Sequence, residues 1–155
     1  MLDYERTAGY RTRQRLSEPI LPEHLRLIIS MHPGPTAASL VDPHWRMWVA
    51  SKLIRDTFRE RGESHIGADI AGLMTENGKI VRKEWSVELV RPGSQLASVS
   101  FNDTSVLNPG RLVRRTWMPV EVDGDRYVVV YDQLFDVYVD RLPPLDLECE
   151  TKAEL

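Results

Sequence analysis

The sequence contains a single cysteine, Cys149, among its 155 residues. One thiol cannot form a disulfide within the chain, so a disulfide-stabilised secreted domain is excluded. No apolar run approaches the roughly 20 residues that cross a membrane, and residues 1–16 are charged without the apolar core of a signal peptide. We therefore expect a protein of the cytoplasm or of an intracellular particle, without membrane contact and not secreted.

Signature motifs of catalysis and cofactor binding are also missing. The sequence has no His-Glu-x-x-His or Cys-x-x-Cys metal motif, no phosphate-binding loop, no dinucleotide fingerprint and no Gly-x-Ser-x-Gly elbow. Cys149 lies in a charged segment without a neighbouring base, which argues against a catalytic thiol. The sequence thus predicts no metal and no cofactor, and it favours a non-catalytic protein over an enzyme without deciding the question.

The composition is that of an ordinary globular domain, but the charge is unevenly distributed. Hydrophobic residues make up 42% of the chain and charged residues 28%, which disfavours intrinsic disorder. The net charge is −3, yet residues 1–115 hold 17 Lys and Arg against 13 Asp and Glu, while residues 116–155 hold 3 against 10. A basic segment and an acidic segment can pair within one fold or between neighbouring subunits.

The stretch from 111 to 142 has the clearest local pattern. Two runs rich in Val, Tyr and Phe flank Asp123-Gly124, and Asp-Gly between alternating apolar residues is a strong signal for a β-hairpin. A strand as long as 126–141 exceeds the usual length, so we expect a bulge or bend near Asp132-Gln133. Pro119 has no amide hydrogen to donate, which predicts that its strand is locally at an edge.

A helix is predicted from Asp42 to Gly62. Asp42 is a favourable N-cap, proline suits the first helical position, and Gly62 suits the position after the last turn. Trp45 and Trp48 fall outside the apolar face of this helix. Either the chain itself covers these two tryptophans, or they are exposed anchors for a partner protein, a role in which tryptophan is over-represented.

The remaining segments complete an α+β prediction. Residues 25–31 and 66–75 are compatible with either helix or strand, Asn77-Gly78 indicates a tight turn, and residues 79–91 and 96–101 are predicted strands. We expect one long amphipathic helix packed on a mainly antiparallel sheet that ends in a long β-hairpin. The predicted organisation is a basic N-terminal arm at 1–18, a single domain at 19–144 and an extended acidic tail at 145–155.

Two charged sets suggest how copies of the chain could join. The arm contains Arg-x-Arg-x-Arg, and a row of aspartates occupies one face of the last predicted strand. The aspartates are about 13 Å apart at 3.3 Å per residue, too far to share a metal ion, so we interpret them as a docking surface. An arm bound to a neighbour's acidic row makes a head-to-tail contact, which yields a ring or a filament. The predicted partner-binding residues are Arg11, Arg13, Arg15, Trp45, Trp48, Asp132, Asp136 and Asp140.

The function expected from these features is that of a non-catalytic interaction or assembly subunit in a larger protein complex. Adaptor or connector proteins of microbial or viral particles fit this outline by analogy of fold alone. The alternative is a small hydrolase with a cleft between helix and sheet that uses His44, His65 and Asp69. Nucleic-acid binding through the arginine arm is disfavoured because the whole chain is acidic.

Overall fold

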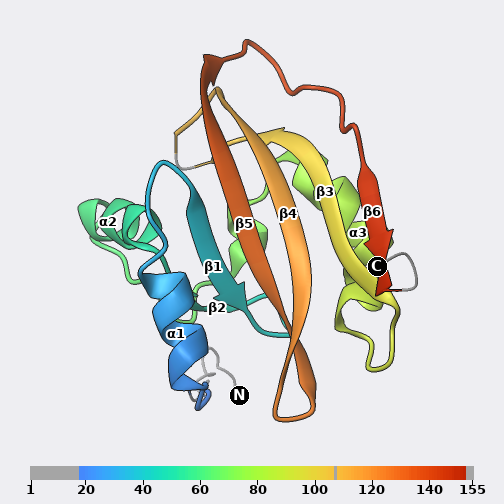
Figure 1. Ribbon diagram of the computed structural model, residues 1–155. Coiled ribbons are helices and arrows are strands. Elements are labelled where there is room, and N and C mark those ends of the chain that lie inside the picture. The colour runs from blue at the N-terminus through green and yellow to red at the C-terminus, as the bar shows by residue number, and fades with distance from the viewer. Residues whose placement is uncertain (1–17, 107, 153–155) are drawn as a thin grey trace, which may run out of the picture.

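The computed structural model describes residues 18–106 and 108–152, with the backbone alone described at 71 and 72. Within these ranges the chain forms three α-helices and a six-stranded antiparallel sheet, which confirms the α+β class. The strand order is β2-β1-β5-β4-β3-β6 (Figure 1). The elements are α1 (Glu23–Ser30), β1 (Ala37–Val41), β2 (Met47–Ala50), α2 (Lys52–Glu60), the 3-10 helix η1 (Ile70–Leu73), α3 (Glu76–Val90), β3 (Leu96–Thr104), β4 (Arg111–Val122), β5 (Asp125–Tyr138) and β6 (Glu148–Thr151).

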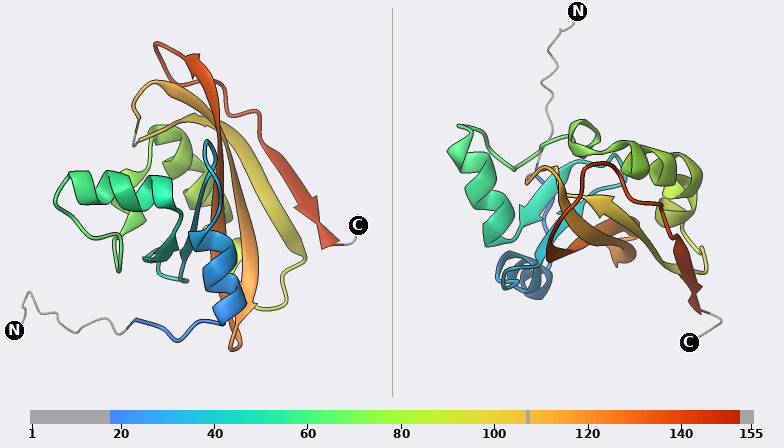
Figure 2. Two further views of the ribbon diagram at one scale, coloured as in Figure 1. Left: turned by 60° about the vertical axis from the view of Figure 1, so that its left-hand side comes forward. Right: turned by 90° about the horizontal axis from the view of Figure 1, so that it is seen from above.

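The helices lie on both sides of the sheet, so the fold has two apolar layers. The right-hand view of Figure 2 shows α2 and α3 on one side and α1 on the other. The larger core cluster joins α2, η1 and α3 to the sheet, and the smaller one lies between α1 and strands β1, β2 and β5. We call these two sides the α2/α3 face and the α1 face. None of the helices in the described ranges has the length and apolar character needed to traverse a membrane.

Strands β4 and β5 are the longest elements of the sheet, and the turn at Asp123 and Gly124 joins them. Both turn residues have positive φ, 51° at Asp123 and 86° at Gly124. Pairing is continuous past Asp132 and Gln133, and the register shifts between Arg111 and Val113 instead. On β5 this shift lies between Leu134 and Tyr138, so the irregularity falls just past the position expected for it at Asp132-Gln133.

The predicted helix from Asp42 to Gly62 is wrong in its first half. Residues Met47–Ala50 form strand β2, and only Lys52–Glu60 form helix α2. The Asp42 carboxylate accepts hydrogen bonds from the backbone amides of His44 and Arg46 at 2.8 and 3.0 Å, so it closes a turn instead of capping a helix. All four residues of β2 are buried, because the apolar layers cover it on both faces of the sheet.

The predicted turn at Asn77-Gly78 and the predicted strand at 79–91 are also wrong, because both belong to helix α3. The Thr75 hydroxyl accepts a hydrogen bond from the amide of Gly78 at 3.2 Å, which is the geometry of an N-cap. The Asn77 amide group donates to the carbonyls of Asn102 and Pro143 at 3.1 and 2.9 Å. These contacts from distant parts of the chain hold Asn-Gly in the first helical turn.

The two undecided segments and the expected tail have definite structures. Residues 25–31 belong mainly to helix α1, and the segment 66–75 contains turns and the 3-10 helix η1. Within the expected extended tail at 145–155, residues Glu148–Thr151 form strand β6, which pairs with β3 through partners such as Val99 and Cys149. Strand β6 is thus the outer strand next to β3 in Figure 1.

Candidate functional site

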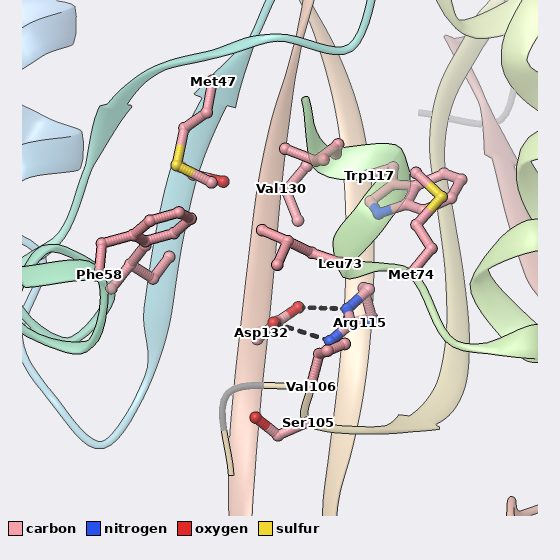
Figure 3. Close-up of a pocket in the computed structure, with 13 residues that line it drawn as sticks. Met47, Phe58, Leu73, Met74, Ser105, Val106, Arg115, Trp117, Val130 and Asp132 are labelled. Carbon is pink, nitrogen blue, oxygen red and sulfur yellow. Dashed lines mark hydrogen bonds and ion pairs between the residues drawn. The ribbon is translucent and has the colours of Figure 1, made fainter. Parts of the chain in front are cut away.

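An apolar pocket opens on the α2/α3 face of the sheet, where α2 and η1 pack over the central strands. Its cavity volume is about 70 Å³. Figure 3 shows side chains from β4 and β5 forming one wall, with Phe58 and Leu73 approaching from the helical side. The pocket is lined by Ser39, Met47, Ile54, Phe58, Ile70, Leu73, Met74, Ser105, Val106, Arg115, Trp117, Val130 and Asp132.

Two cross-strand pairs make up the β4 and β5 part of this pocket. Arg115 pairs with Asp132, and Trp117 pairs with Val130 in the antiparallel register. Side chains two residues apart in a strand lie on the same face, so β4 presents Arg115 and Trp117 together and β5 presents Val130 and Asp132. One pair is ionic and the other apolar, which divides the pocket into a polar end and an apolar end.

The polar end is a buried ion network around Arg115. The Arg115 guanidinium donates to both Asp132 carboxylate oxygens at 2.8 and 3.1 Å, and to Asp103 Oδ2 at 2.6 Å. Asp103 is fully buried, and its other oxygen accepts from the Thr75 hydroxyl at 2.5 Å and from the Thr104 amide at 2.8 Å. The Thr75 that caps α3 therefore also ties the start of that helix to the network.

Two opposing effects set the pKa values of the network. Burial disfavours the charged forms of its side chains, and ion pairing favours them. Burial raises the pKa of Asp103 above its usual value, although Arg115, the Thr75 hydroxyl and the Thr104 amide each act to lower it. Burial lowers the pKa of Arg115, but Asp132 and Asp103 outweigh that effect, so its pKa is raised overall. Arg115 is therefore a permanent cation whose charge is already matched by two carboxylates.

Trp117 has a buried donor at the other end of the pocket. The side chain is 1% exposed and packs against Trp45 and Phe101, with ring centroids 5.1 Å away in both cases. Its indole nitrogen is buried and has no hydrogen-bond partner within the part of the chain that the structure describes. Figure 3 shows the Trp117 ring at the wall of the pocket, and its buried nitrogen is not open to the cavity.

The predicted acidic row is divided by the structure. Asp132 is in the pocket and its carboxylate is bound by Arg115. Asp136 is exposed near the end of β5, and Asp140 is exposed beyond the end of that strand. Strand β4 thus supplies a counter-charge for Asp132 within the same chain, whereas Asp136 and Asp140 are the exposed members of the row, and docking through the row stays a prediction.

The two tryptophans predicted as exposed anchors are buried. Trp45 and Trp48 have exposed fractions of 3% and 4%. Trp45 belongs to the larger core cluster, whereas Trp48 belongs to the cluster beneath α1 and donates from Nε1 to Asp42 Oδ2 at 2.8 Å. Of the two alternatives, burial by the chain itself is the one found, because the segment that carries the tryptophans is a covered strand and turn instead of a helix. Arg11, Arg13 and Arg15 lie outside the described residues.

The residues of the alternative hydrolase site do not line one pocket. Asp69 lines an open depression with residues such as Glu63 and Ser64, but neither His44 nor His65 lines it. Burial and the neighbouring Arg55 lower the pKa of His65, whereas His44 is exposed. Across residues 18–106 and 108–152, no group of three or more His, Cys, Asp or Glu side chains is arranged to hold a metal ion.

Arg115, Trp117 and Asp103 were not among the residues predicted from the sequence to form a site. A usable signal was the alternation of β4, which places an arginine and a tryptophan on one strand face between apolar neighbours. Asp103 had no such signal, because its partners Thr75 and Arg115 are 28 and 12 residues away in the chain.

No family model matches the chain, and no curated protein has a matching sequence.

Proposed function

We propose that this protein binds a small, largely apolar group in the pocket between α2, η1 and the sheet, without catalysing a reaction. The observation that supports the proposal is an apolar cavity next to a fully paired ion network. Apolar side chains from β2, α2, η1 and β5 converge there, among them Met47, Phe58, Leu73 and Val130. Concave apolar sites with a few convergent polar groups are the usual form of ligand sites.

The polar groups of the pocket are better suited to structure than to catalysis. A general base must take a proton from the substrate, and a carboxylate paired with a guanidinium is a weaker base because the cation stabilises its ionised form. Both Asp132 oxygens and both Asp103 oxygens already accept hydrogen bonds from Arg115, Thr75 or the Thr104 amide. Engaged carboxylates of this kind hold β3, β4 and β5 in register around the cavity.

The cavity size limits the bound group. A site for one water needs about 10–15 Å³, so a cavity of about 70 Å³ offers roughly five to seven such positions. Sites for drug-sized molecules reach roughly 300–1,000 Å³, far above this value. The expected ligand is therefore a compact molecule, or the small apolar end of a larger one that extends through the open side.

Toluene is a suitable probe, because it is apolar and compact. Wild-type protein labelled with ¹⁵N should show toluene-dependent shifts of the Trp117 indole resonance, which is assigned by its loss in Trp117→Phe. Val130→Phe fills the pocket and should abolish the shifts. The matched control Val87→Phe changes an exposed residue of α3 and should keep them. If wild type does not respond, or both valine variants respond alike, the pocket is not the binding site.

Self-association remains a second proposal, supported by the exposed end of β5. Val137 and Tyr138 are exposed apolar side chains there, with the exposed Asp136 beside them and Asp140 just beyond. An acidic surface with apolar neighbours suits a basic segment of another copy, such as residues 11–15. Deleting residues 1–15 should then leave a folded monomer, as judged by molecular mass at two salt concentrations. An unchanged oligomer would exclude the arm as connector.

A further inference from the structure

We infer that the Ser39 hydroxyl is the hydrogen-bonding group for the pocket ligand, and that this ligand carries a hydroxyl or carbonyl oxygen on a compact apolar frame. The inference rests on the proposed binding function and specifies the chemistry of the same site. The observation that leads to it is a buried serine that lines the cavity and makes no side-chain hydrogen bond to another described residue.

Strand β1 places Ser39 on the α2/α3 face of the sheet. Ser39 pairs with Ala50 of β2 on one side and with Val130 of β5 on the other, and Val130 also lines the pocket. The residues two positions away in β1, Ala37 and Val41, belong to the larger core cluster on this face. The Ser39 hydroxyl is therefore a polar group among apolar neighbours in the sheet.

The other polar side chains of the pocket are already engaged. Arg115 and Asp132 are bonded to each other, and the Ser105 hydroxyl accepts a hydrogen bond from the Asn108 amide at 3.1 Å. No hydrogen bond joins the Ser39 hydroxyl to any residue that the structure describes. Of the polar groups that line the cavity, this hydroxyl is thus the one that a ligand can engage without displacing a partner.

The Ser39 oxygen is open to the cavity, in contrast to the indole nitrogen of Trp117. Within the described residues, the sealed side-chain atoms without a partner are Trp117 Nε1 and Arg126 Nε. The Ser39 oxygen also lacks a partner but is not one of these sealed atoms. Because the residue is 2% exposed and lines the pocket, the cavity is the side from which a ligand reaches it.

The properties of a hydroxyl define the oxygen groups that it binds. A serine hydroxyl donates one hydrogen bond and accepts others, so it can pair with a ligand hydroxyl or carbonyl. A buried hydroxyl without a partner loses the bonds that it makes in water, which favours a ligand that supplies one. Figure 3 shows Met47 and Val130 toward one end of the pocket and Asp132 toward the other. The apolar frame of the ligand would contact Met47 and Phe58 beside Ser39.

Two matched pairs of ring compounds test the inference. Phenol resembles toluene in shape but has a hydroxyl in place of the methyl group. Cyclohexanone resembles methylenecyclohexane but has a carbonyl oxygen in place of the terminal carbon. All four are uncharged at pH 7. Titration of ¹⁵N-labelled full-length protein gives a dissociation constant for each compound, in wild type and in Ser39→Ala.

Ser100→Ala is the matched control for this substitution. Ser100 lies in β3 between Val99 and Phe101, which both belong to the larger core cluster, so its side chain is on the opposite face of the sheet. Its hydroxyl is hydrogen-bonded to the Thr116 hydroxyl at 2.9 Å, and it does not line the pocket. The control removes the same atom from a sheet serine without changing the cavity.

We expect Ser39→Ala to weaken binding of phenol or cyclohexanone about fivefold relative to its oxygen-free partner, the ratio that one net hydrogen bond gives. Toluene and methylenecyclohexane should bind wild type and Ser39→Ala equally, and Ser100→Ala should leave all four constants unchanged. The pair that responds shows whether the hydroxyl or the carbonyl is the preferred oxygen, and a response of both pairs shows that Ser39 accepts either.

Should Ser39→Ala fail to fold, the wild-type constants still decide the matter. An oxygen group that enters an apolar site without a partner should bind at least about fivefold more weakly than its oxygen-free counterpart. We expect instead that phenol or cyclohexanone binds wild type at least as tightly as its counterpart does. A fivefold or larger deficit in both pairs would overturn the inference.

The outcomes separate this inference from the proposed function. If toluene binds but neither pair depends on Ser39, the pocket remains an apolar binding site and the role of Ser39 is wrong. If Ser39→Ala weakens all four compounds equally, the substitution acts through the shape of the pocket, and the hydrogen bond is excluded. If none of the four compounds binds wild type, the proposed function itself is wrong.

Discussion

Arg114 and Arg115 are adjacent in β4, yet their guanidinium groups lie on opposite faces of the sheet. Arg114 donates to Glu148 Oε1 at 2.6 Å and to Asn102 Oδ1 at 3.0 Å, and the Glu148 side chain is largely exposed. Arg115 donates to Asp103, which is fully buried, and to Asp132 in the pocket. The alternation of a strand thus gives two identical side chains different energetic roles.

Arg115→Met should destabilise the protein far more than Arg114→Met. The first substitution leaves Asp103 and Asp132 without their counter-charge, which costs about 3–5 kcal/mol for a buried pair. The second removes pairs with largely exposed partners, worth about 0–1 kcal/mol. Urea unfolding followed by circular dichroism measures both free energies. Similar losses in the two variants would mean that the Arg115 network is not buried as described.

Asp103→Asn should change the pH dependence of stability in a defined direction. Because the pKa of Asp103 is raised by folding, the folded state binds its proton more readily than the unfolded state does. Asp103 therefore contributes stability that is present at low pH. Wild type loses this contribution as the pH rises from the usual carboxyl pKa of 3.8, which the unfolded state has, through the raised pKa of Asp103 in the folded state. The variant lacks this contribution.

Thermal melts of wild type and Asp103→Asn between pH 4 and pH 7 test that direction. The stability advantage of wild type over the variant should be greatest at the acidic end and should shrink as the pH rises. Carboxylates with lowered pKa, such as Glu88, titrate in both proteins and cancel in the comparison. An advantage that grows with pH would show that pairing with Arg115 outweighs burial at Asp103.

Trp48→Ala should unfold or strongly destabilise the protein instead of only weakening association. Trp48 is buried beneath α1 and its indole donates to Asp42, so truncation creates a cavity and loses a hydrogen bond. The expected cost is about 3–5 kcal/mol. Val87→Ala, at an exposed position of α3, should stay within about 0.5 kcal/mol of wild type. If the Trp48→Ala protein keeps native stability but no longer associates, Trp48 is an exposed partner contact and not a core residue.

Gly124→Val should destabilise the turn between β4 and β5. Gly124 has φ of 86°, a left-handed conformation that costs a β-branched residue about 1–2 kcal/mol or more. Gly124→Asn is the matched control, because asparagine tolerates this region better, and it should lose less stability. Chemical denaturation of the two variants gives the comparison, and equal losses would mean that backbone conformation does not limit the choice of residue here.

Local sequence signals determined the parts of this protein whose structure depends on neighbouring residues. The alternation of apolar residues on both sides of Asp123-Gly124 depends on side-chain period and turn chemistry alone, and β4 and β5 occupy these runs. The same alternation puts Arg115 and Trp117 on one strand face. The α+β class follows from recognising such strands beside helical segments.

Tertiary structure decided the segments whose local signals were ambiguous. Apart from Arg46, residues 45–50 are apolar, which fits a buried strand as well as a helix, and only the layers on both faces of β2 settle the choice. Asn77 is held in the first turn of α3 by the carbonyls of Asn102 and Pro143, which come from distant parts of the chain. The pocket depends on tertiary structure more than any of these segments does. Its polar end joins Asp103, Arg115 and Asp132, which meet only when β3, β4 and β5 pair in register.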